Sequence, residues 1–427
     1  MKRIVLAGLL ATITSFLWAQ NPEAYINAQE AGRIEKVLAS DEMRGRKTFS
    51  PEIDKAADFI AAEFKTAGLQ PWNKDGSYRQ PFSLVNAKQV SAAATLDGAT
   101  LDPKNMVVVT SQPDWKIDQS SGYETMTIAA GADLFEQAMT AAESGKNMIV
   151  WVDESFATNF PRLGFLKRNM FPSGKNTVFV LTNTQPKQFA LEAKHEIRQQ
   201  QLANVVGILP GKSRKDEYVI FSGHYDHIGI GKPVNGDSIY NGANDDAAGT
   251  TSVILLANYF KKLGNNERTI IFAAFTAEEI GGYGSQYFSR QFDPAKVVAM
   301  FNIEMIGTES KWGRNSAYIT GYEKTDMGTI LQESLKGSGF TFHPDPYPDQ
   351  QLFYRSDNAT LARLGVPAHT ISTSKMDNEP NYHKVSDEVQ TLDMDNLAQI
   401  TRAIAISSVS IVSGAKTPSR VKVEDLR

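Results

Sequence analysis

The chain has 427 residues, of which 41% are hydrophobic and 22% charged, with no cysteine and six histidines. This length exceeds one ordinary core, which predicts two compact units or one large unit carrying an insertion. The composition is that of a folded protein and excludes disordered, collagen-like and polytopic membrane chains. The absence of cysteine excludes disulfides and thiolate chemistry, so any metal must be held mainly by histidine and carboxylate.

The N-terminal segment has the pattern of an export signal. Lys2 and Arg3 precede a mainly apolar run from Ile4 to Trp18, and Ala19 is a small residue suited to the position before a cut. The run is shorter than the roughly 20 residues that cross a bilayer. The alternatives are an uncleaved anchor and a buried first helix. We expect a signal peptide at residues 1–19 and a periplasmic or extracellular location.

The charge balance of the exported chain is mildly acidic. Without Lys2 and Arg3, 42 basic side chains face 48 acidic ones, which gives a net charge of −6. Such a chain, with no basic stripe, gives no support for nucleic-acid binding. No later segment is long and apolar enough to span a bilayer. We therefore expect neither a nucleic-acid partner nor, once the signal is removed, a membrane.

Residues 29–69 are predicted to form two helices. Ile34 and Leu38 share one face of the first helix, and Ile53 and Ile60 recur at helical spacing in the second, which Gly68 ends. The sequence pattern then changes to short β-like runs around one helical segment. The runs are Met106–Thr110, Met148–Val152 and Thr177–Thr182, and the helical segment is Asp133–Ser144.

From Asn204 onward, strand-like and helix-like segments alternate, which predicts an α/β fold with a mostly parallel or mixed central sheet flanked by helices. The predicted strands are Val205–Leu209, Tyr218–Ser222, Thr269–Phe275, Val297–Ile303 and Ala368–Ser372. The predicted helices are Gly249–Leu263, Gly284–Arg290, Met327–Leu335 and Asn396–Val412. We expect one domain from residues 20–86 and 202–415, a smaller inserted β-rich domain at 87–201, and a polar tail at 416–427.

Histidines and acids fall where the predicted strands end. In open α/β sheets, ligands bind beyond the carboxyl ends of the strands. Five strand ends or adjoining loops each deliver a candidate: His224 and Asp226, Asp245, Glu278 and Glu279, Glu304, and His383. This convergence predicts a single site at that edge of the sheet.

Each of these short motifs alone has an ordinary structural explanation. A His-x-Asp is commonly a hydrogen-bonded pair, a Glu-Glu a solvated face, and an Asp-Asp before a helix an N-cap. Acids that end apolar strands are harder to explain, because buried carboxylates must be paired or bound to a metal. Together the residues indicate two divalent cations that share an oxygen ligand, and imidazole with carboxylate suits zinc. A carboxylate outside the ligand set would then move the proton of the attacking water.

At these positions the chain resembles the secreted di-zinc exopeptidases, which include bacterial leucine aminopeptidases, yeast aminopeptidase Y and glutamate carboxypeptidase. The resemblance covers about Ile34–Leu69 and Asn204–Val412, in the family's order. It implies a phosphorylase/hydrolase-like zinc peptidase domain and peptide substrates. The matching strings are Gly223-His224-Tyr225-Asp226-His227, Gly242-Ala243-Asn244-Asp245-Asp246, Ala277-Glu278-Glu279-Ile280-Gly281, Asn302-Ile303-Glu304-Met305-Ile306-Gly307 and Tyr382-His383 before Asp387.

The resemblance implies two Zn²⁺ ions per chain. His224 and Glu304 correspond to ligands of one ion, and Glu279 and His383 to ligands of the other. Asp245 corresponds to the ligand that bridges both.

The resemblance also implies two further roles. Glu278 would be the general acid/base that acts on a metal-bridged water, and Asp226 would orient His224. The block at 87–201 would be an inserted domain similar to the protease-associated domain, which shapes access to the site.

The chain departs from the family pattern at two places. Glu304 stands where an Asn-x-Asp-Met-Ile-Gly string usually has aspartate, so the ion it holds would sit differently. Ser356-Asp357-Asn358 stands where the family commonly has Ser-Asp-His. We expect His227 and His369 to be structural or to support the ligands, and His195 and His343 belong to no recognised motif.

These observations predict an exported zinc-dependent metallo-exopeptidase, most simply an aminopeptidase, with pocket walls from Tyr354–Asp357 and Met376–Tyr382. One alternative is a carboxypeptidase of the same fold. Glutaminyl cyclisation is a single-zinc reaction, and the bridging Asp245 with both outer ligand sets argues against it. The last alternative is an inactive binding protein, against which the complete ligand set and Glu278 argue.

Overall fold

The computed structural model describes residues 21–426. The expected signal peptide at 1–19 lies outside the described residues. Among residues 21–426, no helix combines the length and apolar character needed to span a bilayer. The described residues divide into two compact units. The first consists of residues 21–81 and 203–426, and the second is Phe82–Leu202.

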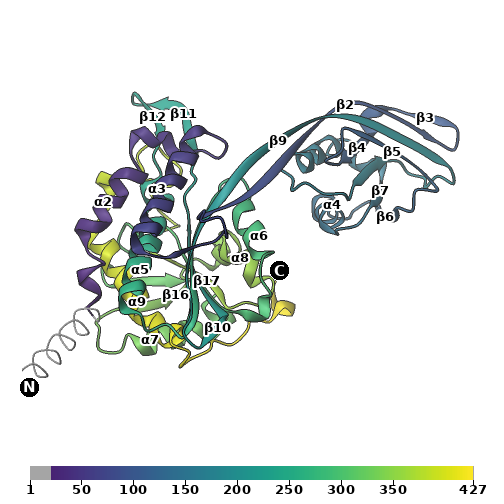
Figure 1. The fold of residues 1–427 in the computed structure, drawn as a ribbon. Helices are drawn as coiled ribbons and strands as arrows, with labels where there is room; N and C mark the ends of the chain where they lie inside the picture. Colours follow the sequence, from purple (N-terminus) through teal and green to yellow (C-terminus); the bar gives the residue numbers. More distant parts are fainter. Residues whose placement is uncertain (1–20, 427) are drawn as a thin grey trace, which may run out of the picture. The chain divides into compact units, whose positions relative to one another are not determined.

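A mixed sheet forms the centre of the first unit (Figure 1). Its four parallel strands lie in the order β17-β14-β10-β13. On one side β15 pairs antiparallel with β17 and parallel with β16, and on the other β9 pairs antiparallel with β13 and β1. The bounds are β1 Gln70–Pro71, β9 Phe189–Leu209, β10 Arg214–His224, β13 Arg268–Phe275, β14 Val297–Ile303, β15 Ser316–Ile319, β16 Thr341–Pro344 and β17 Ala368–Ser372.

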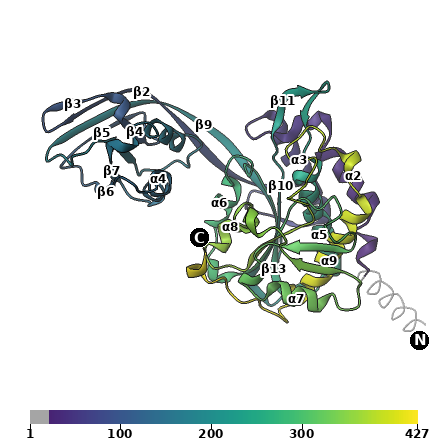
Figure 2. The ribbon, with the colours of Figure 1, turned by 180° about the vertical axis from the view of Figure 1, so that it is seen from behind.

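Helices cover both faces of this sheet, and the view from behind shows the same two layers (Figure 2). One face packs against α2 (Ala28–Leu38), α3 (Pro51–Ala67), α5 (Ala248–Leu263), α7 (Met327–Ser334) and α9 (Met394–Val412). The other packs against α6 (Tyr283–Ser289) and α8 (Asn358–Ala362). The predicted α/β class with a mixed central sheet is therefore confirmed.

Alternation along the strands separates the two cores. In β10, Val219 and Phe221 belong to the core under α5, whereas Ile220 faces the core under α6 and α8. The Phe221 ring stacks on Phe272 of β13 and Phe301 of β14, with centroids 5.7 and 4.8 Å apart. This packing fixes the three central strands whose ends carry the predicted site residues.

Two local features of the first unit stand out. Gly68 ends α3 in a left-handed conformation (φ 78°), as predicted. A two-stranded hairpin, β11 (Gly229–Val234) and β12 (Asp237–Tyr240), follows β10 and was not predicted.

The second unit has its own four-stranded sheet, in the order β4-β8-β7-β6. The strands β6, β7 and β8 are parallel, β4 is antiparallel to β8, and Leu134 and Ala138 of α4 pack in the adjoining core. The division between the units falls inside the long strands β2 and β9. The bounds are β2 Arg79–Leu96, β3 Ala99–Leu101, β4 Met106–Val109, β5 Asp114–Asp118, β6 Glu124–Ile128, α4 Leu134–Glu143, β7 Met148–Val152 and β8 Thr177–Leu181.

Candidate active site

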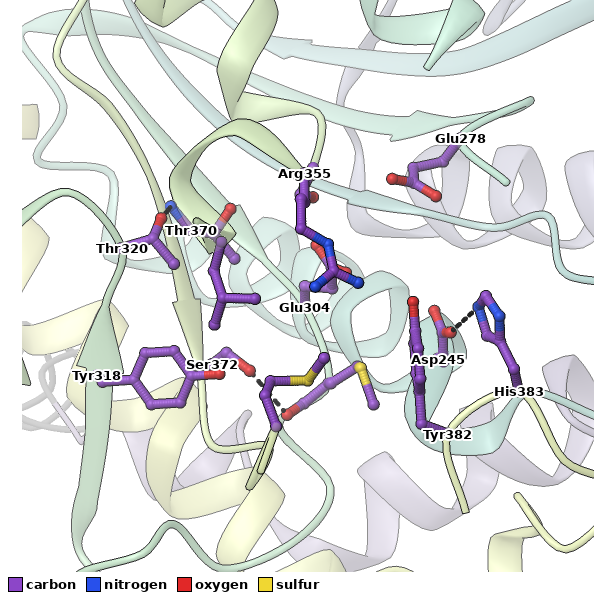
Figure 3. A pocket seen from close by; sticks show the side chains of 14 residues that line it. Asp245, Glu278, Glu304, Tyr318, Thr320, Arg355, Thr370, Ser372, Tyr382 and His383 are labelled. Atoms are coloured by element: carbon purple, nitrogen blue, oxygen red, sulfur yellow. Dashed lines mark hydrogen bonds and ion pairs between the residues drawn. The ribbon is translucent and has the colours of Figure 1, made fainter. Parts of the chain in front are cut away.

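The candidate residues meet at the carboxyl ends of β10, β13 and β14. His224 is the last residue of β10, Glu278 and Glu279 follow β13, and Glu304 comes directly after β14. Asp245 lies in the turn η6 (Ala243–Ala247) before α5. Glu278, Glu304, Asp245, Tyr382 and His383 line one pocket (Figure 3).

Two groups of potential ligand atoms overlap at Asp245. In the first, His224, Asp245 and Glu304 offer atoms that all lie within 4.8 Å of one another. The second group consists of Asp245, Glu279 and His227, whose potential ligand atoms lie within the same distance of one another. His383 also reaches this group, because its Nε2 lies 3.2 Å from Asp245 Oδ2 and 3.2 Å from Glu279 Oε2. The five residues proposed as ligands are thus brought together.

His227 lies closer to the centre than the sequence indicated. Its Nδ1 is 2.7 Å from Glu279 Oε1 and 3.9 Å from Asp245 Oδ2. The two carboxylate oxygens of Glu279 therefore face different histidines, His227 on one side and His383 on the other. This arrangement allows His227 either to orient Glu279 or to supply a nitrogen of its own.

Several donor atoms are buried without an aligned hydrogen-bond partner among the described residues: His224 Nε2, His227 Nδ1, Glu279 Oε1 and Glu304 Oε2. Buried polar atoms are normally satisfied, so a cluster of exceptions requires an explanation. Nitrogen and carboxylate atoms converging on common points are the donors that Zn²⁺ takes in proteins without thiols. The residues present therefore fit a metal centre.

The electrostatics of the cluster favour a positive charge. Burial lowers the pKa of His224, but Asp245 and Glu278 beside it raise the pKa well above the ordinary value of 6.5. Burial likewise opposes the charged form of His383, whose contacts with Asp245 and Glu279 raise its pKa to about 10. A site that attracts protons this strongly would attract a divalent cation for the same reason.

Glu278 stands apart from the two donor groups and faces the pocket half-buried. Burial raises its pKa well above the ordinary value of 4.5, and the neighbouring acids Glu304 and Asp357 raise it further. Raised affinity for a proton is what a carboxylate needs to act as general acid and base near neutral pH.

The carboxylate of Asp226 holds the Glu278 segment rather than the ring of His224. It accepts hydrogen bonds from the backbone N–H of Glu278 (3.1 Å) and of Glu279 (3.4 Å) and from Thr48 Oγ1 (2.9 Å). His224 Nδ1 lies 3.8 Å from Asp226 Oδ1 but 3.1 Å from its backbone oxygen. The ring is therefore within hydrogen-bond distance of the main chain of Asp226.

Two further buried acids, Asp246 and Asp387, support the site, although neither had a predicted role there. Asp246 accepts hydrogen bonds from the backbone N–H of His224 (3.1 Å) and of Met305 (3.1 Å), so it joins two segments that carry predicted ligands. Asp387 accepts from the N–H of Asn244 (2.8 Å) and Asp245 (3.0 Å). Their place inside the matched strings was the only signal for them.

The remaining histidines lie outside the donor groups. His369 Nδ1 is 2.8 Å from Thr320 O, and its Nε2 is 2.8 Å from Thr325 Oγ1, which gives it a structural role. His343 stacks on Trp312. His195 is buried in the second unit.

The pocket beside the donor groups encloses about 500 Å³, including the part open to solvent. As predicted, its walls include Arg355 and Ser356 from one loop and Met376 and Tyr382 from the other. The Tyr382 ring stacks on His383 with centroids 3.9 Å apart. Further lining residues are Met305, Tyr318, Thr320, Leu352, Thr370 and Ser372.

Asn358, which replaces the histidine of the family pattern, supports this wall from behind. Its Nδ2 donates to Phe353 O (3.0 Å) and Ala368 O (3.3 Å), and its Oδ1 accepts from Thr370 Oγ1 (2.9 Å). The substitution therefore leaves the donor groups untouched.

Comparison with known proteins agrees with this geometry. The model of peptidase family M28 matches residues 204–407. A probable leucine aminopeptidase of Trichophyton verrucosum (strain HKI 0517) is 27% identical over 205 residues, which cover 46% of this chain and 54% of that protein. The chain thus spans about half the length of the curated relatives it matches.

Two solved structures share the fold. An aminopeptidase from Aneurinibacillus sp. strain AM-1 aligns with a TM-score of 0.54 and 18% identity, over 95% of this chain and 99% of its own. A zinc aminopeptidase from Bacillus subtilis aligns with a TM-score of 0.54 and 15% identity, over 94% of this chain and 99% of its own.

Proposed function

We propose that the chain is an exported zinc-dependent exopeptidase that releases residues from the amino end of peptides, in line with the match of the peptidase family M28 model to residues 204–407. The observation that carries the proposal is the pair of donor groups that share Asp245 and open, with Glu278, on one pocket. The name of the T. verrucosum relative and the two structural matches support the amino end.

We assign two zinc ions to the donor groups. His224 and Glu304 would hold one ion, Glu279 and His383 the other, and Asp245 both. When bound, the ions would polarise the scissile carbonyl as Lewis acids and would lower the pKa of a water molecule so that it is readily deprotonated to a nucleophile.

The chain's own residues complete the reaction. Glu278 would take the proton of the attacking water at its carboxylate and deliver it to the nitrogen of the leaving amine. Asp226 serves this step indirectly, because its carboxylate holds the backbone of Glu278 and Glu279. The Tyr382 ring, stacked on His383, restricts that side chain to the orientation in which Nε2 faces Asp245.

Three alternatives remain as outcomes of the experiment below. A carboxypeptidase would use the same centre on the other end of a peptide. A glutaminyl cyclase needs one zinc ion, so the second donor group around Glu279 argues against it. An inactive binding protein would have no need of Glu278, whose raised pKa suits proton transfer.

The export part of the proposal rests on the sequence of residues 1–19. A basic start, a short apolar run and Ala19 are the parts of a cleavable signal. We infer that the enzyme acts on peptides in the periplasm or outside the cell.

A panel of short peptides tests the assignment. Free, amino-blocked and carboxyl-blocked versions of one sequence are incubated with the purified protein, with and without a chelator. We expect cleavage of the free and carboxyl-blocked peptides, no cleavage of the amino-blocked peptide, and loss of all activity with chelator that zinc restores. Cleavage of the amino-blocked peptide alone would indicate a carboxypeptidase. No cleavage of any peptide by the zinc-loaded protein would overturn the proposal.

A further inference from the structure

Arg46 lies in the first unit, directly behind the loops that carry the metal ligands. Its side chain is 0% exposed, which makes it one of the largest fully buried side chains among the described residues. A buried guanidinium is stable only if its N–H groups find hydrogen-bond acceptors, so the positions of these acceptors show what Arg46 holds together.

The guanidinium joins three separate segments through backbone carbonyls. Nε donates to Tyr225 O (2.8 Å), Nη1 to Leu38 O (2.5 Å) and Asn241 O (2.7 Å), and Nη2 to Gly242 O (2.8 Å). Tyr225 directly follows His224, and Gly242 lies three residues before Asp245. One side chain therefore connects the loop of the first histidine ligand with the turn of the shared carboxylate.

The backbone around Arg46 is held in an unfavourable conformation. Arg44, Gly45 and Arg46 are consecutive residues with φ of 46°, 67° and 45°, and the two arginines have a Cβ that disfavours this region. Such residues reduce stability and persist only where surrounding contacts hold them. Gly45 is required here, because an added Cβ would lie 2.3 Å from Tyr240 O and 2.8 Å from Gly229 Cα.

The same segment touches the site at two further points. The backbone oxygen of Arg46 accepts from the N–H of His227 (3.3 Å), and Thr48 Oγ1 donates to Asp226 Oδ2 (2.9 Å). From the opposite side, Asp387 binds the N–H groups of Asn244 and Asp245. The turn before α5 is thus held at its carbonyls by a buried cation and at its amides by a buried anion.

We propose that Arg46 is a positioning residue of the metal centre: it fixes the loop of His224 and the turn of Asp245 at the spacing a shared cation requires, before any cation binds. This inference rests on the proposed function only in taking His224 and Asp245 as metal ligands. Arginine suits the task and lysine does not, because one planar group with five donors reaches three segments at once.

Arg268 provides a matched control. It is also buried (1% exposed) and also donates to backbone carbonyls, Ile411 O (2.7 Å) and Lys416 O (2.6 Å), at the amino end of β13 away from the donor groups. A lysine at either position keeps the positive charge but lacks the planar guanidinium group and its several N–H donors. A difference between the two variants therefore reports position and not the general cost of replacing a buried arginine.

The experiment compares Arg46→Lys and Arg268→Lys with the wild type by zinc dissociation constant, kcat, KM and melting temperature of the metal-free protein. We expect Arg46→Lys to weaken zinc binding about 10- to 100-fold and to lower kcat with little change in KM. Arg268→Lys should lower the melting temperature while zinc affinity stays within about twofold of wild type. Wild-type zinc affinity in Arg46→Lys, or equal losses in both variants, would overturn the proposal.

A second measurement needs no variant. Amide hydrogen exchange of residues 241–246 is followed in the wild-type protein with zinc and after its removal. We expect the segment to stay protected without zinc, because Arg46 and Asp387 hold it. Exchange as fast as that of exposed loops would show that zinc alone orders the turn. The zinc dissociation constants and the hydrogen exchange are measured without peptidase activity, so these results can support the inference where the proposed function fails, and the reverse.

Discussion

The two ends of the parallel strands differ in how far their buried polar groups are hydrogen-bonded. At the amino ends, Arg268 hydrogen-bonds Ile411 O, Lys416 O and Glu217, and Arg420 donates to Val297 O (2.8 Å), so C-terminal residues cover this edge. At the carboxyl ends, His224 Nε2, Glu279 Oε1 and Glu304 Oε2 have no aligned hydrogen-bond partner among the described residues.

The backbone shows the same contrast. Ala277 after β13, Met305 after β14 and His383 in the last loop have φ of 62°, 53° and 55°, in the region that residues with a Cβ rarely adopt. Unsatisfied atoms and left-handed residues both reduce stability. Their presence beside the donor groups indicates that this edge is shaped for binding, whereas the other edge stabilises the fold.

The largest effect is expected at Glu278. Glu278→Gln keeps the shape of the side chain but removes its ability to carry a proton, so kcat should fall by about 10²- to 10⁴-fold. Because Glu278 lies outside both donor groups, zinc content by elemental analysis should not change. Turnover close to that of the wild type would remove Glu278 from the mechanism.

Alanine variants of the two histidines beside Glu279, His383 and His227, test which of them is a metal ligand and which supports a ligand. His383→Ala should lower zinc content and reduce activity by at least about tenfold, because Nε2 faces both Asp245 and Glu279. His227→Ala should have the smaller effect, since only Glu279 Oε1 lies within hydrogen-bond distance of its Nδ1. The reverse order, measured in the same zinc and activity assays, would exchange their roles.

Glu35 of α2 is a fully buried acid whose two carboxylate oxygens have no aligned hydrogen-bond partner among the described residues. Burial raises its pKa to about 8. The folded chain therefore keeps a proton that the unfolded chain releases above its ordinary value of 4.5, and stability falls as pH rises between these values. Glu35→Gln removes this dependence.

Urea unfolding of the metal-free protein measures the effect. Between pH 6 and 8, the wild type should lose roughly 2 kcal/mol more of its free energy of unfolding than Glu35→Gln. Parallel losses in the two proteins would show that Glu35 ionises normally in the folded chain.

The smallest effect is expected at Glu304, where the family pattern has aspartate. Glu304→Asp restores that residue but shortens the reach of the carboxylate toward His224 and Asp245. Zinc binding should weaken about three- to tenfold, as for other small displacements around a metal. Titration with a competing chelator measures the change, and tighter binding would show that the surrounding backbone is built for aspartate.

The central strands could be predicted because both of their faces are buried. β13, β14 and β17 match their predicted bounds to within one residue, because their side chains are buried along the whole strand. β10 was predicted only at Tyr218–Ser222 and starts four residues earlier, at Arg214, because Arg214–Glu217 is polar. The long strand β2 was not predicted, and β9 was predicted only at its end, Val205–Leu209, since polar and apolar residues are mixed along much of their exposed length. No local pattern marks such strands, because pairing between distant segments forms them.

The five proposed ligands could be identified because each directly follows such a run or stands in a matched string. Arg46 could not, since in the sequence it ends the polar run Asp41–Arg46 and reads as a solvated cation. Its burial depends on Tyr225 and Asn241, 179 and 195 residues away. The place of His227 beside Glu279 is likewise a product of tertiary structure.

The central claim is that two cations bind at the carboxyl edge and that peptide cleavage depends on them. Stepwise addition of zinc to the metal-free protein, with bound metal and hydrolysis of a free peptide measured in each sample, tests it most directly. The account predicts that binding saturates near two ions per chain and that activity rises with occupancy. Saturation without any peptide hydrolysis, or hydrolysis that persists in the metal-free protein, would contradict it.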